Sequence, residues 1–204
     1  MAARPRTSAA LSCAGSRSAT PTRCALSSKP PRPVSDTAPA FTIREIQPDE
    51  YEELGEVTVR AYAAVPGDDV DYHPQLRNVA RRAGRIPVLV AVDPDGRVLG
   101  GVAYVPGPGA PYAESERGKE AGFRMLAVDP PAGGRGIGRA LAQACIDRAR
   151  AAGRSGVAIL TRPSRPVAHG LYTSLGFVRD PSRDIEYDPG RWLWSFVLTL
   201  DEAS

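Results

Sequence analysis

The segment "DPPAGGRGIGRAL", residues 129–141, contains four glycines and two arginines between two segments of different character. The apolar run "FRMLAV" (123–128) precedes it, and the alanine-rich run "ALAQACIDRARAAG" (140–153) continues from its end. The first run predicts a buried strand and the second predicts a helix. Because backbone N–H groups in a glycine-rich loop at a helix N-terminus attract anions, the segment predicts a phosphate-binding turn.

Two common phosphate loops do not fit this segment. The dinucleotide-binding pattern G-x-G-x-x-G fails because Arg139 and Leu141 stand where its third glycine would be. The pattern G-x-x-x-x-G-K-[ST] finds its glycine spacing at Gly133 and Gly138. It fails because Arg139 and Ala140 follow in place of the lysine and the hydroxyl residue. The turn therefore belongs to a different kind of phosphate site.

The chain from residue 41 onward predicts short strands and amphipathic helices. The predicted strands cover 41–46, 86–93, 97–105, 122–129, 156–161, 176–180 and 193–200, and the predicted helices cover 48–65, 71–84, 136–152 and 166–176. A "DPDG" turn makes a hairpin of the second and third strands, and residues 106–121 form a polar loop. The order β-α-α-β-β-β-α-β-α-β-β predicts a mixed α/β (α+β) fold. Its sheet would be seven-stranded and mostly antiparallel, with helices on both faces.

Residues 1–40 differ in composition from the rest of the chain. They are rich in Ala, Ser, Arg and Pro and contain six basic residues against one acidic residue, although the whole chain has a net charge of only +3. Such a segment cannot bury enough apolar area to fold, so we expect a disordered basic tail. A transit peptide and a start codon assigned too early are the alternatives. The folded domain is expected over residues 41–204.

The composition excludes several classes of protein. With the tail set aside, the domain carries a net negative charge, so no nucleic-acid-binding face is expected. No apolar run has the length of a membrane-spanning helix, so no membrane partner is expected. Cys13, Cys24 and Cys145 lack disulfide or metal spacing, and His73 and His169 lie far apart. These features predict no metal site and a reducing, cytoplasmic location.

Two motifs in the chain resemble those of one enzyme family. Residues 133–138 resemble the pyrophosphate loop [Q/R]-x-x-G-x-[G/A] of the GNAT N-acetyltransferases, with matches at Gly136 and Gly138 and with Gly133 in place of the Gln or Arg. The segment "AHGLYTSLGFV" resembles the family's second signature, A-x-x-L-Y-x-x-x-G-F, with matches at Ala168, Leu171, Tyr172, Gly176 and Phe177. Over residues 41–200 the chain is identified as a member of this family, similar to its small single-domain bacterial members.

The resemblance implies acetyl-CoA as the cosubstrate. In the family, the pantetheine arm pairs with the main chain of the strand before the loop, which here is Met125, Leu126, Ala127 and Val128. A backbone N–H near Leu126 would polarise the thioester carbonyl. The pyrophosphate would lie against Gly133, Gly134, Arg135, Gly136, Ile137, Gly138 and Arg139. Because Gly133 replaces the usual Gln or Arg, side-chain contacts to the pyrophosphate would come from Arg135 or Arg139.

The resemblance also implies the reaction. A primary amine of a small molecule or peptide would attack acetyl-CoA directly in a ternary complex. Tyr172 matches the family's general acid, and a phenol with a pKa of about 10 is protonated at neutral pH and can protonate the departing thiolate. On the predicted helix, Tyr172 lies at the edge of a core stripe formed by Val167, Leu171 and Leu175.

The proton acceptor does not follow the family pattern. Several members carry a glutamate four residues before the position of Leu126, and Gly122 stands there in this chain. Glu120, two residues earlier, can share the same strand face and is the candidate base. Glu114, Glu116 and a chain of water molecules are the alternatives.

Other departures concern the acceptor side. Arg165 stands where the second motif often has an asparagine, and it could contact a CoA phosphate or face the solvent. His169 lies three residues before Tyr172 and could orient it. An acidic, partly aromatic set of residues favours a cationic amine acceptor; its members are Tyr112, Glu114, Glu116, Asp184, Glu186 and Asp188.

Two other functions stay open. One is a non-catalytic acyl-CoA-binding or sensor module of the same fold, which the loss of the carboxylate at Gly122 favours. The other is a nucleotide-binding protein that uses the same glycine loop. Homodimers are common in the resembled family, so the partners considered are an amine acceptor and a second copy of the chain.

Overall fold

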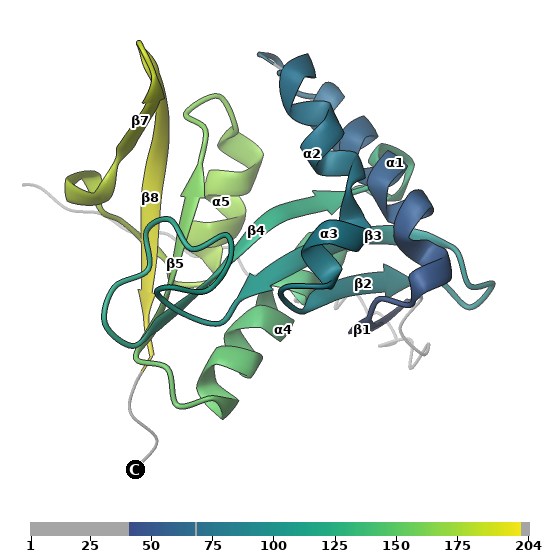
Figure 1. The fold of residues 1–204 in the computed structure, drawn as a ribbon, viewed down its shortest axis with the longest axis horizontal. Helices are drawn as coiled ribbons and strands as arrows, with labels where there is room; N and C mark the ends of the chain where they lie inside the picture. The colour runs from purple at the N-terminus through teal and green to yellow at the C-terminus, as the bar shows by residue number, and fades with distance from the viewer. Residues whose placement is uncertain (1–40, 68, 201–204) are drawn as a thin grey trace, which may run out of the picture. The chain divides into compact units, whose positions relative to one another are not determined.

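The computed structural model describes residues 41–67 and 69–200, and Figure 1 shows their arrangement. The predicted tail at residues 1–40, with Cys13 and Cys24, lies outside the described residues, as do the last four residues. Within the described part of the chain, no helix is long and apolar enough to cross a membrane.

An eight-stranded sheet lies at the centre of residues 41–200. Its order is β1-β2-β3-β4-β5-β8-β6, and β7 pairs with β8. The strands are β1 (Thr42–Glu45), β2 (Val88–Val92), β3 (Val98–Val105), β4 (Glu120–Val128), β5 (Gly156–Thr161), β6 (Val178–Arg179), β7 (Ile185–Asp188) and β8 (Arg191–Thr199). Only the β4–β5 pair is parallel among these strands, and it is the pair that a helical crossover connects.

Helices pack on both faces of the sheet. They are α1 (Tyr51–Ala63), α2 (His73–Arg77), α3 (Val79–Ala83), α4 (Ile137–Ala151) and α5 (Pro166–Ser174). Alternate residues of β2 belong to the two cores: Val90 packs with Leu54 of α1, and Leu89 packs with Leu141 of α4. The helices α1 to α3 therefore lie on one face and α4 on the other (Figure 1).

The predicted fold class and the predicted order of elements are confirmed, with three differences. The prediction of seven strands is one too few, because residues 185–188, for which no strand was predicted, form the hairpin strand β7. The predicted helix 71–84 is divided at Asn78, whose ψ of 66° is not helical and whose side chain accepts a hydrogen bond from the Arg81 N–H. The strand predicted from residue 122 begins at Glu120.

Candidate active site

A cavity of about 330 Å³ lies where the second half of β4 meets the glycine loop and the beginnings of α4 and α5. The end of α1 forms another wall through Ala61 and Tyr62. Most of the residues predicted to bind acetyl-CoA line this cavity, namely Leu126, Ala127, Val128, Gly133, Gly134, Gly136, Ile137 and Gly138. Met125, Arg135 and Arg139 were predicted with them but do not line it.

The cavity opens because β4 and β5 separate. The two strands are paired only where Glu120–Gly122 lies beside Gly156–Ala158. Beyond this point β5 remains paired with β8 along its whole length, and β4 remains paired with β3. From Phe123 onward, the side of β4 that faces away from β3 therefore has no neighbouring strand among residues 41–67 and 69–200.

The backbone of β4 bulges at Met125. This residue has a φ of 53°, which is uncommon for any residue other than glycine. The register with β3 shifts at the same place, since Gly101 lies opposite Ala127 whereas Ala103 lies opposite Arg124. A bulge turns backbone groups out of the regular ladder. The main chain after Met125 can thus offer N–H and C=O groups to an extended ligand arm.

The glycine loop leads directly into the N-terminus of α4. Gly134 and Gly136 have φ values of 75° and 80°, a conformation that side chains other than glycine rarely adopt. No side chain of the described residues caps the helix, and the N–H of Ala140 makes the hydrogen bond to the Gly136 carbonyl, at 3.0 Å. The N–H groups of the first turn therefore have no partner within the helix and can bind an anion.

The start of the glycine loop is held by Asp129, a residue that the sequence did not mark. Its carboxylate is buried and accepts hydrogen bonds from Arg60 Nε of α1 at 3.1 Å and from Arg97 Nη2 at 3.0 Å. Its carbonyl accepts a hydrogen bond from the Ala132 N–H. These contacts fix the direction in which the chain leaves β4 toward the loop.

Arg135 and Arg139 are the two arginines of the loop that are predicted to contact the pyrophosphate. Both side chains are exposed and neither lines the cavity. Arg139 Nη2 donates a hydrogen bond of 2.5 Å to the hydroxyl of Ser174, near the end of α5. The cavity therefore offers backbone groups to a pyrophosphate, and the arginines add positive charge from outside it.

Tyr172 lies in the core at the inner side of α5. The prediction that it lies at the edge of a core stripe is wrong, because Val167 is 87% exposed whereas Tyr172 is 6% exposed. Its ring packs against Phe123, Phe177 and Phe196 at centroid distances of 5.9, 5.8 and 6.2 Å. Burial raises the pKa of Tyr172 well above its ordinary value, so its hydroxyl is a neutral hydrogen-bond donor. The neighbouring Ala168 and Leu171 line the cavity.

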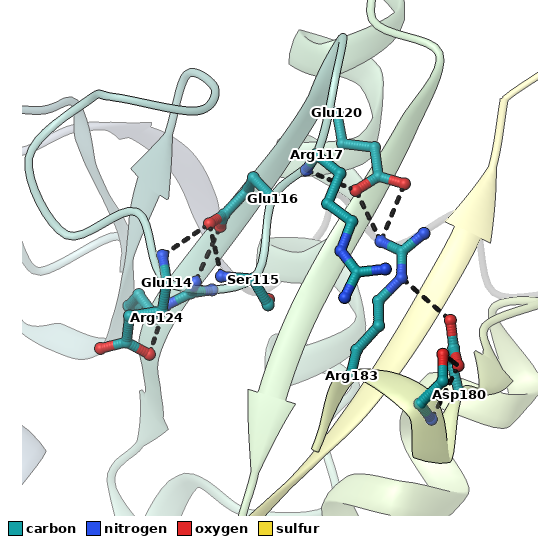
Figure 2. A network of polar contacts seen from close by, with 9 residues as sticks. Glu114, Ser115, Glu116, Arg117, Glu120, Arg124, Asp180 and Arg183 are labelled. Atoms are coloured by element: carbon teal, nitrogen blue, oxygen red, sulfur yellow. Dashed lines mark hydrogen bonds and ion pairs between the residues drawn. The ribbon is translucent and has the colours of Figure 1, made fainter. Parts of the chain in front are cut away.

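Glu120, the candidate base, does not line the cavity. It lies at the first residue of β4, where β4 is still paired with β5. Arg183 Nη1 donates to both of its carboxylate oxygens, at 3.0 and 2.7 Å, and the Arg117 N–H donates to Oε2 (Figure 2). The side chain joins the chain segment after β6 to the start of β4, and the geometry separates it from the residues around Leu126.

A different carboxylate lies over Gly122. The side chain of Glu116 turns inward from the loop before β4, and a Cβ built at Gly122 would overlap its Oε1 atom. Glu116 Oε2 accepts hydrogen bonds from the N–H groups of Glu114 and Ser115, and Oε1 accepts one from Arg124 Nη2 at 2.8 Å (Figure 2). Arg124 Nε lies 3.2 Å from Glu114 Oε2.

Tyr62 and Arg165 form a further wall of the cavity. The Arg165 guanidinium lies 4.2 Å from the centre of the Tyr62 ring, a cation–π distance. Burial raises the pKa of Tyr62, and the positive charge of Arg165 opposes the shift. Sequence reasoning missed Tyr62, although it follows Thr58 by four residues and Leu54 by eight, a spacing that places it on the inward face of α1.

His169 packs at the end of β5. Its Nε2 lies 3.0 Å from the carbonyl oxygen of Arg162, and its ring stacks on Trp194 at 5.4 Å. Among the described residues, no hydrogen bond or ring contact joins His169 to Tyr172. Its place therefore gives no support to the expectation that it orients Tyr172.

Comparisons with known proteins identify relatives of one kind. Residues 42–177 match the model of the acetyltransferase (GNAT) family. A mycothiol acetyltransferase from Arthrobacter sp. (strain FB24) is 31% identical over 156 residues, which are 65% of this chain and 46% of that protein. The chain thus spans about half the length of the curated relative it matches.

Two of the solved structures with the same fold are described as containing acetyl-CoA. The putative acetyltransferase yncA from Salmonella typhimurium, with its cofactor acetyl-CoA, has a TM-score of 0.58 at 24% identity, over 81% of this chain and 96% of that one. A GNAT family acetyltransferase from Brucella melitensis in complex with acetyl-CoA has a TM-score of 0.56 at 23% identity, over 82% and 92%. At 24% and 23% sequence identity, the similarity to these two structures establishes the fold of this chain.

Proposed function

The chain belongs to the acetyltransferase (GNAT) family, and from this premise we propose that it transfers the acetyl group of acetyl-CoA to a primary amine. The acceptor is a small molecule or a peptide, and attack is direct, in a ternary complex. The observation that carries the proposal is the cavity between β4, the glycine loop and α5, whose lining contains the glycine loop and, from the second motif, Ala168 and Leu171. Structural neighbours bound to acetyl-CoA support this choice of cosubstrate.

The cavity suits each part of acetyl-CoA in turn. The backbone after Met125 has no neighbouring strand on the cavity side within the described part of the chain, and it pairs with the pantetheine arm. The unpaired N–H groups at the start of α4 bind the pyrophosphate, and the arginines Arg135 and Arg139 add attraction from the surface. The apolar walls formed by Ala168 and Leu171 exclude water from the thioester.

The reaction needs a polarised carbonyl and a proton for the leaving group. A backbone N–H near Leu126 donates to the thioester oxygen and stabilises its developing negative charge. The amine nitrogen forms the new C–N bond, and the C–S bond breaks. Tyr172 supplies a proton to the thiolate, since burial keeps its hydroxyl protonated. Its role rests on the family match and on its position next to Leu171, which lines the cavity.

A non-catalytic acyl-CoA-binding module is the second candidate. Two observations favour it: residue 122 is a glycine, and the carboxylate of Glu120 is held by Arg183 away from the cavity. Such a module would bind acetyl-CoA and release no thiol when amines are added.

An assay of free CoA thiol separates these two functions. The native protein is incubated with acetyl-CoA and a panel of alkylamines, amino acids, aminoglycosides and peptides with free amino termini. We expect amine-dependent thiol release with at least one class, matched by an equal amount of acetylated amine. Saturable binding of acetyl-CoA without release on any amine would favour the binding module.

A further inference from the structure

Asp129 lies at the point where β4 ends and the glycine loop begins, and four contacts hold it there. Its N–H donates to the carbonyl of Leu99 in β3, and its carbonyl accepts from the N–H of Ala132, each at 2.8 Å. Its two carboxylate oxygens accept from Arg60 Nε at 3.1 Å and from Arg97 Nη2 at 3.0 Å. Its side chain is only 2% exposed. Every polar group of this buried residue therefore has a partner.

The ion pair between Asp129 and Arg60 joins two walls of the acetyl-CoA cavity. Arg60 belongs to α1 and is followed directly by Ala61 and Tyr62, which line the cavity. Asp129 follows Val128 and leads into the glycine loop, and these form a second wall. Neither member of the pair lines the cavity itself. The pair therefore ties one wall to the other from outside the ligand space.

The ion pair between Asp129 and Arg97 leads to a part of the chain that does not line the cavity. Arg97 ends the turn between β2 and β3, and residues 93–97 are absent from the cavity walls. The Asp93 carboxylate fixes this turn by accepting a hydrogen bond from the Arg97 N–H at 2.9 Å. Arg60 and Arg97 thus carry the same charge to the same carboxylate, but only Arg60 is next to residues of a cavity wall.

The charge of Asp129 has the wrong sign for binding the ligand directly. Acetyl-CoA carries several negative charges on its phosphates, and a carboxylate just before the glycine loop repels them. A buried carboxylate is also costly unless cations compensate it, and here two guanidinium groups do so. What Asp129 contributes to a pyrophosphate site is therefore the placement of the loop.

We propose that Asp129 is a positioning residue for acetyl-CoA. By pairing with Arg60 it holds the glycine loop at a fixed distance from α1. The N–H groups at the start of α4 then lie where the pyrophosphate arrives when the pantetheine arm is on β4. The inference rests on the proposed place of the pyrophosphate at the glycine loop, and it is independent of the acceptor and of acetyl transfer.

Asp129→Asn keeps the size of the side chain and removes its charge. The new amide NH2 group faces one of the two arginine donors, so one of the two contacts is lost. We expect the affinity for acetyl-CoA, measured by calorimetric titration, to fall by about tenfold, since loss of a charge-assisted hydrogen bond changes an equilibrium by that factor or more. Removal of a negative charge would by itself strengthen anion binding. Unchanged or tighter binding would therefore contradict the proposal.

Glu50→Gln is the control for a loss of stability alone. Glu50 is another buried carboxylate held by an arginine, with Arg44 Nη1 at 2.8 Å, and it lies just before α1. At 1.5 Å per residue it is roughly 15 Å from Arg60 along the helix axis. Urea unfolding should show that both variants are less stable, whereas only Asp129→Asn should lose acetyl-CoA affinity. An equal loss of affinity in the two variants would assign the effect to stability and overturn the positioning role.

The two arginines separate placement of the loop from charge. Arg60→Gln and Arg97→Gln each remove one positive charge from a side chain that is about half exposed, 49% and 57%. We expect Arg60→Gln to weaken acetyl-CoA binding several-fold more than Arg97→Gln does. Equal effects would show that only charge matters and would contradict the proposal. Because both arginines reach the surface, this comparison decides the question even if Asp129→Asn does not fold.

These outcomes are distinct from those of the proposed function, because calorimetry needs no amine. A native protein that binds acetyl-CoA and acetylates no amine loses the proposed function, and the positioning role is still decided by the variants. Where thiol release is observed, Asp129→Asn should raise the KM for acetyl-CoA and leave kcat within about twofold. A fall in kcat at an unchanged KM, or no binding of acetyl-CoA by the native protein, would overturn the inference.

Discussion

The carboxylate of Glu116 lies in the space that a side chain at Gly122 would occupy. Because Gly122 has no side chain, the Glu116 carboxylate fits beside it and places a negative charge at this point of β4. The carbonyl oxygen of Ala158 lies on the same side, 2.7 Å from an ideal Cβ at Gly122. Loop, β4 and β5 therefore meet at one position where only a glycine fits.

Gly122→Ala should destabilise the protein by about 1–3 kcal/mol, the usual effect of overpacking a filled site. The new methyl group meets both the Glu116 carboxylate and the backbone of β5, and the latter cannot move without disturbing the sheet. Urea unfolding measures the change. Gly170→Ala on α5 is the control and should be neutral or slightly stabilising, because no neighbouring group of the described residues lies within 4 Å of an ideal Cβ built there. Equal effects of the two changes would contradict this packing.

Tyr172→Phe should lower turnover by at least about tenfold, with little change in acetyl-CoA affinity. The ring contacts with Phe123, Phe177 and Phe196 persist in the variant, so the fold is retained and only the hydroxyl is lost. Steady-state thiol release and acetyl-CoA titration measure the two quantities. Full turnover in the variant would remove Tyr172 from the mechanism.

Tyr62, Tyr72 and Tyr172 should resist ionisation in the folded protein, since burial raises the pKa of each. Below the ordinary tyrosine pKa of about 10, both folded and unfolded chains hold these protons, and stability is fully present. Above it the unfolded chain releases them first, so stability declines as pH rises toward the folded pKa values. Urea unfolding at increasing pH, with tyrosinate absorbance as a second readout, checks this. Complete tyrosine ionisation near pH ~10 in a folded protein would contradict it.

Glu120→Gln should lower stability by roughly 1–3 kcal/mol and leave turnover nearly intact, because the variant weakens a charge-assisted pair with Arg183. The exposed Glu186→Gln, which keeps an acceptor for the Gly190 N–H, is the control and should change stability less. A large loss of kcat in a fully folded Glu120→Gln variant would return Glu120 to the role of base.

The elements that the sequence predicts well are those with local signals. The strand, glycine loop and helix at 123–153 follow from an apolar run, from glycines that adopt positive φ and from a helical apolar face. The fold class follows from the order of such elements. Strand β7 was missed because its partner, β8, contains both buried and exposed residues. The segment "DPG" at 188–190 is nevertheless a turn signal between the two strands.

The candidate site was only partly predictable for a physical reason. Glu120 and Glu116 are both glutamates at or just before the start of β4, and the sequence does not distinguish them. In the structure Arg183, 63 residues from Glu120, donates hydrogen bonds to Glu120, whereas Arg124 donates one to Glu116. Which acid pairs with which arginine depends on how loops cross the sheet, and no local pattern encodes that. Tyr172 was marked by the family motif, but its burial depends on Phe196 of the distant β8.

The left-handed conformation of Gly136 offers a way to probe the cofactor site. Its φ of 80° strains any other residue, and it forms the N-cap of α4. Gly136→Val should weaken acetyl-CoA binding at least about tenfold by displacing the backbone N–H groups. Gly96→Val is the matched control, because Gly96 in the β2–β3 turn has a similar φ of 87° and, like Gly136, no described group within 4 Å of an ideal Cβ. This variant should leave acetyl-CoA binding unchanged.

Calorimetric titration of the native protein with acetyl-CoA and, separately, with ATP tests most directly that the cavity beside the glycine loop is an acetyl-CoA site. We predict saturable binding of acetyl-CoA at one site per chain, lost or strongly weakened in Gly136→Val, and no comparable binding of ATP. Tight binding of ATP without binding of acetyl-CoA would contradict the account.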